Sequence, residues 1–366
     1  MESMVNYPSF TEIYRGKKVF LTGHTGFKGS WLLQTLQLFG AIVRGYALSP
    51  IHDNDLYNCI EGDKLCESII ADIRDSHKLR DAIIEFQPDF IFHLAAQPLV
   101  IYSYNNPIET YEVNVLGTLN LLDAIRHLEK KCSVILITTD KVYKNKEWNF
   151  SYKETDLLGG YDPYSSSKAC CELVIDSYRN SFFNPALLAD HRKGIAVARA
   201  GNVIGGGDWA EHRLIPDVVR ALRLNNSISI RNPSSVRPWQ HVLEPIFAYL
   251  LLGGLLDANP IKHGTAYNFG PSSNDTLTVK QVVERAIQIW GSGKYTYEKV
   301  ENPHHEAGLL QLDISKANAD LGWFPKMNTN SALQLTIDWY QNFFNKKETI
   351  INLTKNQILN YWNYFK

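Results

Sequence analysis

The chain has 366 residues, of which 45% are hydrophobic and 20% charged, and this composition excludes a disordered or fibrous protein. Its 37 basic and 38 acidic residues give a net charge of −1, which excludes a protein that binds nucleic acid or an anionic membrane through excess positive charge. Five scattered cysteines without a Cys-x-x-Cys pair predict neither a disulfide framework nor a metal site. The longest apolar run, residues 246–256, falls short of a bilayer span of about 20 residues, so we expect a buried helix there. With no secretory h-region at the N-terminus, a cytoplasmic location is expected.

Strand-like and helix-like segments alternate through the first half of the chain. Short apolar runs predict strands at residues 17–22, 41–48, 68–71, 90–95, 133–138 and 194–199. Apolar residues at helical spacing predict helices at residues 27–39, 75–86, 107–129 and 163–179. Apolar strands that alternate with helices are typical of an α/β fold with a doubly wound parallel sheet.

After residue 200 the pattern changes. Residues 201–207 contain four glycines, and residues 231–238 are rich in Pro, Ser and Arg. Helical patterns recur at residues 215–224, 243–255 and 279–290. We therefore expect a first domain at residues 1–200 and a smaller C-terminal lobe at residues 201–366, with residues near 240–270 returning to the first domain.

A glycine-rich turn, TGHTGFKG at residues 22–29, lies between the first strand and the first helix. Glycine lets the backbone approach a pyrophosphate, and a helix N-terminus favours its negative charge. The alternative is a tight structural turn, since the spacing is not Gly-x-Gly-x-x-Gly, but the flanking strand and helix favour a dinucleotide. We therefore expect a Rossmann-type domain with these residues as cofactor contacts: Gly23, Thr25, Gly26, Phe27, Lys28 and Gly29.

The end of the second strand leaves the choice between NAD and NADP open. Residues 45–50, GYALSP, contain neither an acid for the adenosine ribose nor an arginine for a 2′-phosphate. Asp72 and Ile73, just beyond the third strand, are expected at the adenine edge. For Asp72 the alternative is the N-cap of the next helix.

Tyr164 and Lys168 are four residues apart, so a helix places the phenol and the ammonium on one face. A tyrosine with a usual pKa near 10 becomes a base near neutral pH when cations stabilise its phenolate. Lys168 and a nicotinamide ring are the expected cations. Such pairs also occur on solvated helix faces, but here Thr139, Asp140 and Lys141 follow a buried strand at the edge where open α/β sheets bind ligands.

With these motifs the chain resembles the extended short-chain dehydrogenase/reductase family. The resemblance is carried by the glycine turn, HLAA at residues 93–96, NVLGT at residues 114–118 and the Tyr164/Lys168 pair. It narrows to the nucleotide-sugar dehydratases because Asp140 follows Thr139, and stretches at residues 22–32, 93–100, 199–209, 237–245 and 305–307 extend it along the chain. It implies bound NAD, further cofactor contacts at Leu94, Ala95 and Ala96, and a homodimer or tetramer built on the helices at 107–129 and 163–179.

The resemblance also implies a reaction. Oxidation of a hexose at C4 makes the C5 proton acidic, so water is lost across C5–C6 and the hydride then returns to C6. Tyr164 is expected to take the C4 hydroxyl proton, with Thr139 hydrogen-bonded to that oxygen and Lys168 orienting the cofactor ribose. Asp140 is expected to protonate the leaving C6 hydroxyl. Two roles stay open for Lys141, which stands where dehydratases of dTDP-glucose have Glu: the C5 base, or a charge that stabilises the enolate.

The second lobe is expected to bind the nucleotide-sugar. Arg237 suits a diphosphate through its fork of donors, although alone it would be read as a surface arginine. The resemblance adds Asn202, Arg213 and the adjoining Leu214, and more weakly Arg231. Relatives usually carry Arg where this chain has Ile101, which alters either a contact near the nicotinamide or the local packing.

The implied product is a deoxysugar precursor for a cell-surface polysaccharide such as O-antigen. Two alternatives remain. A nucleotide-sugar 4-epimerase or reductase gives no reason for Asp140 and Lys141. A non-catalytic NAD-binding protein gives no reason for keeping both Tyr164 and Lys168.

Overall fold

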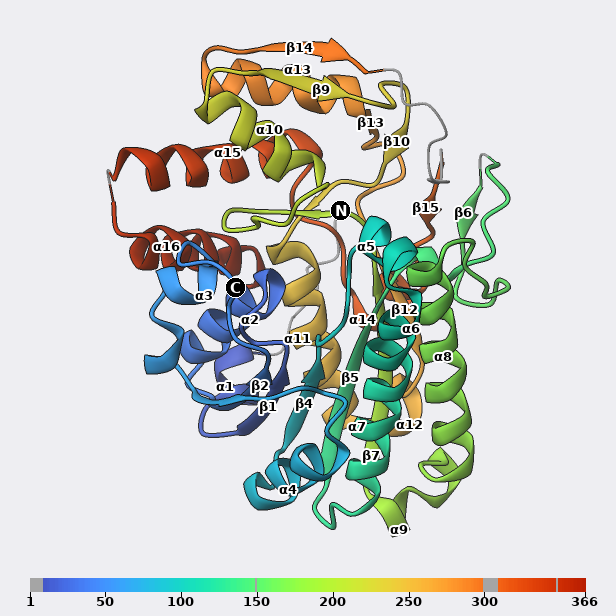
Figure 1. The fold of residues 1–366 in the computed structure, drawn as a ribbon. Coiled ribbons are helices and arrows are strands. Elements are labelled where there is room, and N and C mark those ends of the chain that lie inside the picture. The colour runs from blue at the N-terminus through green and yellow to red at the C-terminus, as the bar shows by residue number, and fades with distance from the viewer. Residues whose placement is uncertain (1–8, 149, 299–308, 347) are drawn as a thin grey trace.

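A sheet of seven parallel strands forms the centre of the computed structural model, which describes residues 9–148, 150–298, 309–346 and 348–366 (Figure 1). Its strands are β1 (Lys18–Thr22), β2 (Ile42–Ala47), β3 (Glu67–Ile70), β4 (Phe90–His93), β5 (Cys132–Thr139), β7 (Lys193–Ala200) and β12 (Ala266–Phe269). The spatial order is β12-β7-β5-β4-β1-β2-β3. The expected doubly wound parallel sheet is therefore confirmed.

The chain reverses its direction of travel across the sheet between β1 and β4. From β1 it runs outward through β2 to β3, and then it crosses to β4 on the other side of β1. The register pairs Thr22 with His93 at the ends of β1 and β4, and Thr139 with Ala200 at the ends of β5 and β7. In open α/β sheets a ligand binds outside the carboxyl ends of the strands at such a switch point.

Helices cover both faces of the sheet (Figure 1). α2 (Phe27–Leu38) and α11 (Leu243–Ala258) pack on one face, and α4 (Ser76–Phe86), α7 (Gly117–Arg126) and α8 (Pro163–Ser181) pack on the other. Within β1, Val19 and Leu21 enter one core while Phe20 enters the other, as the alternation of side chains in a strand requires. The apolar run at 246–256 lies inside α11 and is buried, as expected; among the described residues no helix is long and apolar enough to cross a bilayer.

The helix expected at residues 107–129 is interrupted and ends early. α6 (Pro107–Tyr111) continues into a π-helical turn, η2 (Glu112–Leu116), and then into α7, which ends at Arg126. Within η2, the Asn114 side chain accepts a hydrogen bond from Gln97 N at 2.8 Å and donates one to Ser167 Oγ at 2.8 Å. A π-helical turn widens the helix locally and frequently occurs at functional sites. Here it turns Asn114 toward the helix that carries Tyr164.

A second group of elements forms the upper part of Figure 1. It contains α10 (Leu214–Arg223), the parallel pair β9 (Ser227–Ile230) and β14 (Lys294–Tyr297), α13 (Val279–Trp290) and α15 (Thr329–Asn345). The C-terminal helix α16 (Ile350–Trp362) instead packs against α2. The domain boundary at residue 200 stays a prediction; β12 and α11 follow that boundary and pack with the sheet, within the 240–270 segment expected to return to the first domain.

Short elements complete the chain. They are α1 (Phe10–Tyr14), α3 (Leu56–Cys59), η1 (Gly62–Lys64), α5 (Val100–Asn105), η3 (Asp140–Val142), β6 (Ser151–Tyr152), η4 (Pro185–Leu187), α9 (Leu188–His191), β8 (Val203–Ile204), β10 (Val236–Arg237), β11 (Gln240–His241), α12 (Pro260–His263), β13 (Leu277–Thr278), β15 (Gln311–Leu312), α14 (Ser315–Leu321) and η5 (Asn363–Phe365).

Candidate active site

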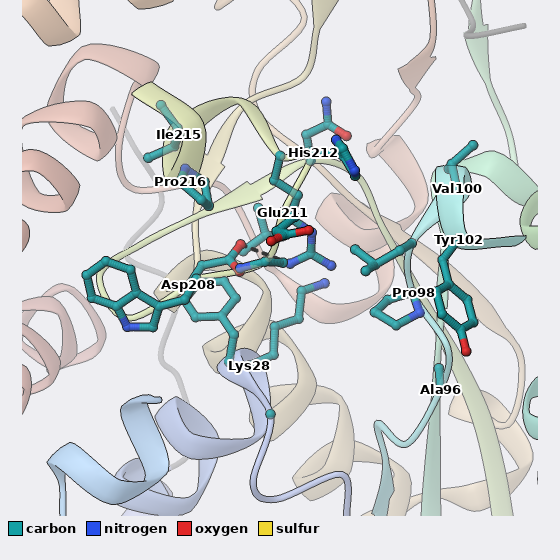
Figure 2. A pocket seen from close by; sticks show the side chains of 18 of the residues that line it. Lys28, Ala96, Pro98, Val100, Tyr102, Asp208, Glu211, His212, Ile215 and Pro216 are labelled. Carbon is teal, nitrogen blue, oxygen red and sulfur yellow. Dashed lines mark hydrogen bonds and ion pairs between the residues drawn. The ribbon is translucent and has the colours of Figure 1, made fainter. Parts of the chain in front are cut away.

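A cavity of about 1500 Å³ opens over the carboxyl ends of the strands, between the sheet and the upper elements (Figure 2). Every residue that the sequence nominated contributes to its lining. These residues are Gly23, Thr25, Gly26, Phe27, Lys28, Gly29, Asp72, Ile73, Leu94, Ala95, Ala96, Thr139, Asp140, Lys141, Tyr164, Lys168, Asn202, Arg213, Leu214, Arg231 and Arg237. The structure thus brings together residues spread over more than half of the sequence.

The glycine turn packs closely against the segment that follows β4. Gly23 has φ +75°, and a Cβ on it would lie 2.8 Å from the backbone nitrogen of Ala95. A Cβ on Gly29 would lie 2.0 Å from the carbonyl oxygen of Gly23. By contrast, a Cβ on Gly26, the N-cap of α2, would meet only this carbonyl oxygen, at 3.4 Å, and would otherwise project into open space.

The N-terminus of α2 therefore faces the cavity with no described side chain capping it. Exposed helix amides and a small residue at the point of approach are what a pyrophosphate requires. The residues present fit a dinucleotide cofactor.

The Asp72 carboxyl is ion-paired with Arg74 and does not cap a helix. The Arg74 guanidinium lies 2.6 Å from Asp72 Oδ2 and holds the pKa of this carboxyl below its usual range. The N-cap of α4 is Asp75, which accepts a hydrogen bond from Lys78 N at 3.0 Å. The N-cap alternative for Asp72 is therefore wrong, while a contact with the adenine edge stays a prediction.

Tyr164 and Lys168 lie at the start of α8. Pro163 occupies the first turn, and Asp162 caps the helix by accepting a hydrogen bond from Ser165 N at 2.9 Å. Both functional side chains are buried, and the Lys168 ammonium donates a hydrogen bond to the carbonyl oxygen of Ile137 on β5 at 3.2 Å. The helix thus positions the phenol and the ammonium one turn apart, next to β5.

The surroundings of Tyr164 favour its neutral phenol. Burial is the main cause that raises the pKa of this phenol to about 12; the Thr139 hydroxyl and the Arg213 guanidinium act to lower it, and the Asp140 carboxylate acts to raise it. Burial also lowers the pKa of the Lys168 ammonium. Stabilisation of the phenolate by Lys168 and a nicotinamide ring therefore stays a prediction.

The end of β5 carries an acid in a protected position. The Thr139 hydroxyl donates a hydrogen bond to Asp140 Oδ1 at 2.9 Å, and Asp140 is 2% exposed. Burial raises the pKa of this carboxyl, although Lys141 and Arg237 act in the opposite direction. The direction of this shift favours the protonated form, which a proton donor to a leaving hydroxyl requires.

Lys141 lines the cavity beside this acid. Its backbone nitrogen donates to Thr139 Oγ1 at 3.4 Å, and its half-buried ammonium makes no hydrogen bond or ion pair with any residue that the structure describes. The ammonium is therefore available to a bound molecule. Its two alternative roles, base or charge, both remain compatible with this position.

Two cationic side chains, Lys28 and Arg213, line the same cavity, and Figure 2 shows Lys28 near Asp208. Arg213, the N-cap of α10, donates to Asp208 Oδ2 at 2.9 Å, and Lys28 projects from the glycine turn into the same region. Burial and the nearby Arg213 lower the pKa of the Lys28 ammonium to about 8. The sequence analysis missed Asp208, although it lies in the quoted stretch at 199–209; Asp208 holds Arg213, which was expected to contact the nucleotide-sugar.

One wall of the cavity carries both charged and apolar side chains. Exposed Arg231 and half-buried Arg237 line it together with apolar side chains of β9 and α13, Ile228, Ile230 and Val279, which the sequence did not single out. These apolar residues carried no signal beyond ordinary strand and helix patterns.

At the near wall, the carbonyl oxygen of Asn202 accepts a hydrogen bond from Gln240 N at 3.1 Å, which fixes the loop after β7. Ile101 on α5 lines the cavity. Of its two alternatives, this favours an altered contact with a bound molecule over a change of packing alone.

Comparison with known proteins agrees with this architecture. A profile of the family described as GDP-mannose 4,6 dehydratase matches residues 20–336. The chain is 47% identical to a CDP-glucose 4,6-dehydratase of Salmonella typhimurium over 95% of this chain and 97% of the relative. It is 27% identical to a UDP-glucose 4-epimerase of Mycoplasma genitalium over 76% of this chain and 83% of the relative.

Solved structures share the fold at lower identity. The dTDP-glucose 4,6-dehydratase DesIV of Streptomyces venezuelae, with NAD bound, superposes with a TM-score of 0.77 at 22% identity, over 91% of this chain and 99% of that one. A UDP-glucose 4-epimerase of Thermotoga maritima, with UDP-glucose, gives 0.75 at 22% identity, over 89% and 99%. From the family profile and the Salmonella relative, the chain belongs to the GDP-mannose 4,6 dehydratase family, within the nucleotide-sugar dehydratases of the extended short-chain dehydrogenases/reductases.

Proposed function

We propose that the chain is a lyase that converts CDP-D-glucose to CDP-4-dehydro-6-deoxy-D-glucose and water, with NAD as its cofactor. The observation that carries the proposal is the meeting of Tyr164, Thr139 and Asp140 at one cavity that a glycine turn and an arginine cluster also line. The name of the Salmonella relative supports the cytidine nucleotide. The NAD of the solved relatives supports the cofactor.

Oxidation at C4 is the first step. Bound NAD would supply a hydride acceptor for C4 and would return the same hydride to C6 at the end. Tyr164 takes the proton of the C4 hydroxyl, while Lys168 on the next turn stabilises the phenolate. Thr139 hydrogen-bonds to the same sugar oxygen and thereby orients it.

Water loss follows because the C5 proton now lies α to a carbonyl. Lys141 faces the cavity and either takes this proton or stabilises the resulting enolate by its charge. Asp140 donates a proton to the departing C6 hydroxyl, and the raised pKa of its carboxyl supports this role. The hydride removed from C4 then returns to C6 while C5 regains a proton, so water is the only other product and no external oxidant is consumed.

The cationic residues suit the diphosphate of the substrate. Arg213 and Arg237 present planar donor forks to phosphate oxygens, with Arg231 further along the wall. Asn202 also lines the cavity and is expected to contact the nucleotide-sugar. The apolar side chains of β9 and α13 then suit the face of the nucleobase.

A homodimer, or a tetramer built from it, is part of the proposal. Three apolar side chains on the packed helices α6, η2 and α8 are exposed: Ile108 at 75%, Leu116 at 49% and Leu173 at 61%. Their burial against a second copy would remove apolar surface from water. We also propose that the enzyme acts in the cytoplasm and supplies deoxysugars for a surface polysaccharide of the O-antigen type.

The test is to incubate the purified protein and NAD with CDP-, dTDP-, GDP- and UDP-glucose in turn. We expect a 4-keto-6-deoxy product, detected by its chromophore in alkali, with CDP-glucose and far less with the others. Formation of a 4-epimer without the chromophore would instead assign an epimerase. Absence of any product with all four sugars would contradict the proposed function.

A further inference from the structure

A buried ion pair joins β7 to α8 next to β5, the strand that ends at Thr139. The proposed mechanism makes no use of this pair. Arg199 on β7 donates to Glu172 on α8 through two parallel hydrogen bonds, Nε to Oε1 and Nη2 to Oε2, both 2.9 Å long. Each side chain is 4% exposed. Because an apolar pair of similar volume is often as stable as a buried ion pair, stability alone gives a weak reason for these charges.

The ion pair is also hydrogen-bonded to β5, the strand whose end lies at the cavity. Thr138 immediately precedes Thr139 on β5 and lies opposite Arg199 in the β5–β7 register. Its hydroxyl donates a hydrogen bond of 2.6 Å to Glu172 Oε1. Glu172 therefore binds both strands at once, from a helix that crosses them.

The same glutamate belongs to the catalytic face of α8. Tyr164, Lys168 and Glu172 follow at intervals of four residues, which places them along one side of the helix. Burial lowers the pKa of the Lys168 ammonium, and Cys171 and the Glu172 carboxylate both act to raise it. This opposition matters because Lys168 must stay charged to stabilise a phenolate.

Other groups also face Lys168 and set its charge. On α8 itself Cys171 raises the pKa of the ammonium. Lys28 on α2 and His93 on β4 also interact electrostatically with it. Burial lowers the pKa of His93 to about 3, so this imidazole is neutral at physiological pH. Among these groups Glu172 is the one whose carboxyl group is ion-paired with an arginine.

The Arg199 guanidinium also makes a hydrogen bond outside the ion pair, to the residue that follows η3. Arg199 Nη1 donates to the Tyr143 hydroxyl at 2.7 Å, and this hydroxyl donates to Asn268 Oδ1 on β12 at 2.7 Å. Tyr143 directly follows η3, the short helix that carries Asp140 and Lys141. The network thus contacts the polypeptide on both sides of the acid–lysine doublet.

We propose that Glu172, locked by Arg199, is a positioning residue that fixes the end of β5 against the catalytic face of α8 and keeps the Lys168 ammonium charged during proton transfer at Tyr164. The inference rests on the proposed oxidation at C4. It assigns the pair a role in the rate of the reaction rather than in substrate binding.

Thr138→Val tests the positioning part with minimal disturbance, because the ion pair itself remains. We expect kcat of the NAD-loaded enzyme to fall about 10-fold with little change in KM, since a small misplacement of reacting groups is costly. Thr138→Ser keeps the hydroxyl and should restore most of the rate. Thr336→Val is the control: this buried hydroxyl bonds only to Ala332 O within α15 among the described contacts, and its loss should leave kcat unchanged.

The double variant E172M/R199M tests the charge part, because it replaces the pair with apolar side chains and leaves no lone buried charge. We expect it to fold and to lose activity at alkaline pH about one pH unit earlier than the wild type, as Lys168 loses its proton sooner. A wild-type kcat and pH profile in this variant, or a wild-type kcat in Thr138→Val, would overturn the proposal.

A readout without turnover separates this inference from the proposed function. In the NAD-loaded protein, the ionisation of the Tyr164 phenol is followed by phenolate absorbance, with Tyr164→Phe as the blank. We expect a higher phenol pKa in E172M/R199M than in the wild type, and an equal pKa would contradict the inference. If the wild type turned over no nucleotide-sugar, the proposed function would fail while this titration would still decide the inference.

Discussion

The hydroxyl of Thr139 is hydrogen-bonded to the carboxylate of Asp140 at 2.9 Å, so the residue expected to orient the sugar C4 oxygen also holds the residue expected to protonate the C6 oxygen. The space beside this pair is tight, because a Cβ on Gly201 would lie 3.0 Å from Asp140 Oδ2. The two functional groups are thus arranged before any substrate enters. Such preorganisation reduces the rearrangement needed during the reaction.

Asp140→Asn should separate oxidation from water loss. The amide cannot donate an acidic proton to the C6 hydroxyl, so we expect product formation to fall by about 10²- to 10⁴-fold. Oxidation at C4 should persist and be visible as absorbance of reduced nicotinamide after CDP-glucose is added. Asp217→Asn is a matched control, because Asp217 also lines the cavity but is ion-paired with Arg220; an equal loss in both variants would contradict the role of Asp140.

Lys141→Met should stop exchange of the C5 hydrogen with solvent deuterium while sparing hydride transfer. Mass spectrometry of the recovered nucleotide-sugar measures this exchange. Lys141→Arg distinguishes the two roles, since arginine keeps the charge but does not act as a base. Recovery of exchange in Lys141→Arg would assign charge stabilisation, and unaltered exchange in Lys141→Met would exclude both roles.

Two glycines of the turn should respond differently to alanine. In Gly29→Ala the new Cβ would lie 2.0 Å from the Gly23 carbonyl oxygen, so we expect a loss of ~2–4 kcal/mol in the free energy of unfolding. In Gly26→Ala the nearest atom would be 3.4 Å away, so the fold should persist while the methyl group obstructs the pyrophosphate. Denaturant unfolding and NAD titration measure the two effects, and a stable Gly29→Ala protein with wild-type NAD affinity would be the contrary result.

Leu173→Glu should weaken the proposed dimer. A charge at this 61% exposed position on α8 would have to be buried without a partner in the assembly. We expect light scattering after size exclusion to report a shift toward monomer. Leu224→Glu, at the C-cap of α10 and 69% exposed, is the control and should leave the mass unchanged.

The stability of the C-terminal segment should depend on pH through Glu244. This side chain is buried in α11, accepts a hydrogen bond from the Tyr361 hydroxyl at 2.7 Å, and burial raises its pKa to about 7 from 4.5. Because the folded state binds the proton more tightly, its contribution to stability is complete below pH 4.5 and is lost as the pH rises through about 7. The Tm should therefore be higher at pH 6 than at pH 8 by on the order of a few °C.

Glu244→Gln should remove most of this pH dependence, because the amide does not titrate. Glu284→Gln, an exposed position on α13, should leave it intact. Equal pH dependence in the wild type and Glu244→Gln would show that other groups govern it.

Several helices and strands could be predicted because the sequence signals for them are local. The helix expected at 279–290 matches α13 at both ends, since Thr278 and Gln281 form a capping box and Gly291 ends the helix with φ +97°. The strand at 17–22 likewise matches β1 to within one residue. Cap chemistry and short apolar runs are carried by adjacent residues, which a sequence displays directly.

The features that the sequence analysis missed depend on contacts between residues that are far apart in the chain. β12 contains four residues of mixed character, and its strand identity depends on pairing with β7, more than sixty residues earlier. The π-helical turn depends on Asn114 reaching across to Ser167. At the site, the sequence placed Tyr164 and Asp140 correctly at the cavity, but burial, which dominates the pKa of both, emerges only from the packed structure.

The anchor of Lys168 has a consequence for how this scaffold can diversify. Its ammonium is bound to a main-chain carbonyl of β5, that of Ile137, which no substitution can delete. The position of this ammonium is therefore fixed by the main chain and not by a replaceable side chain. Asp140 and Lys141, which follow the strand, are by contrast present only as side chains, so we expect substitutions there to alter the proposed elimination without moving the anchor of Lys168.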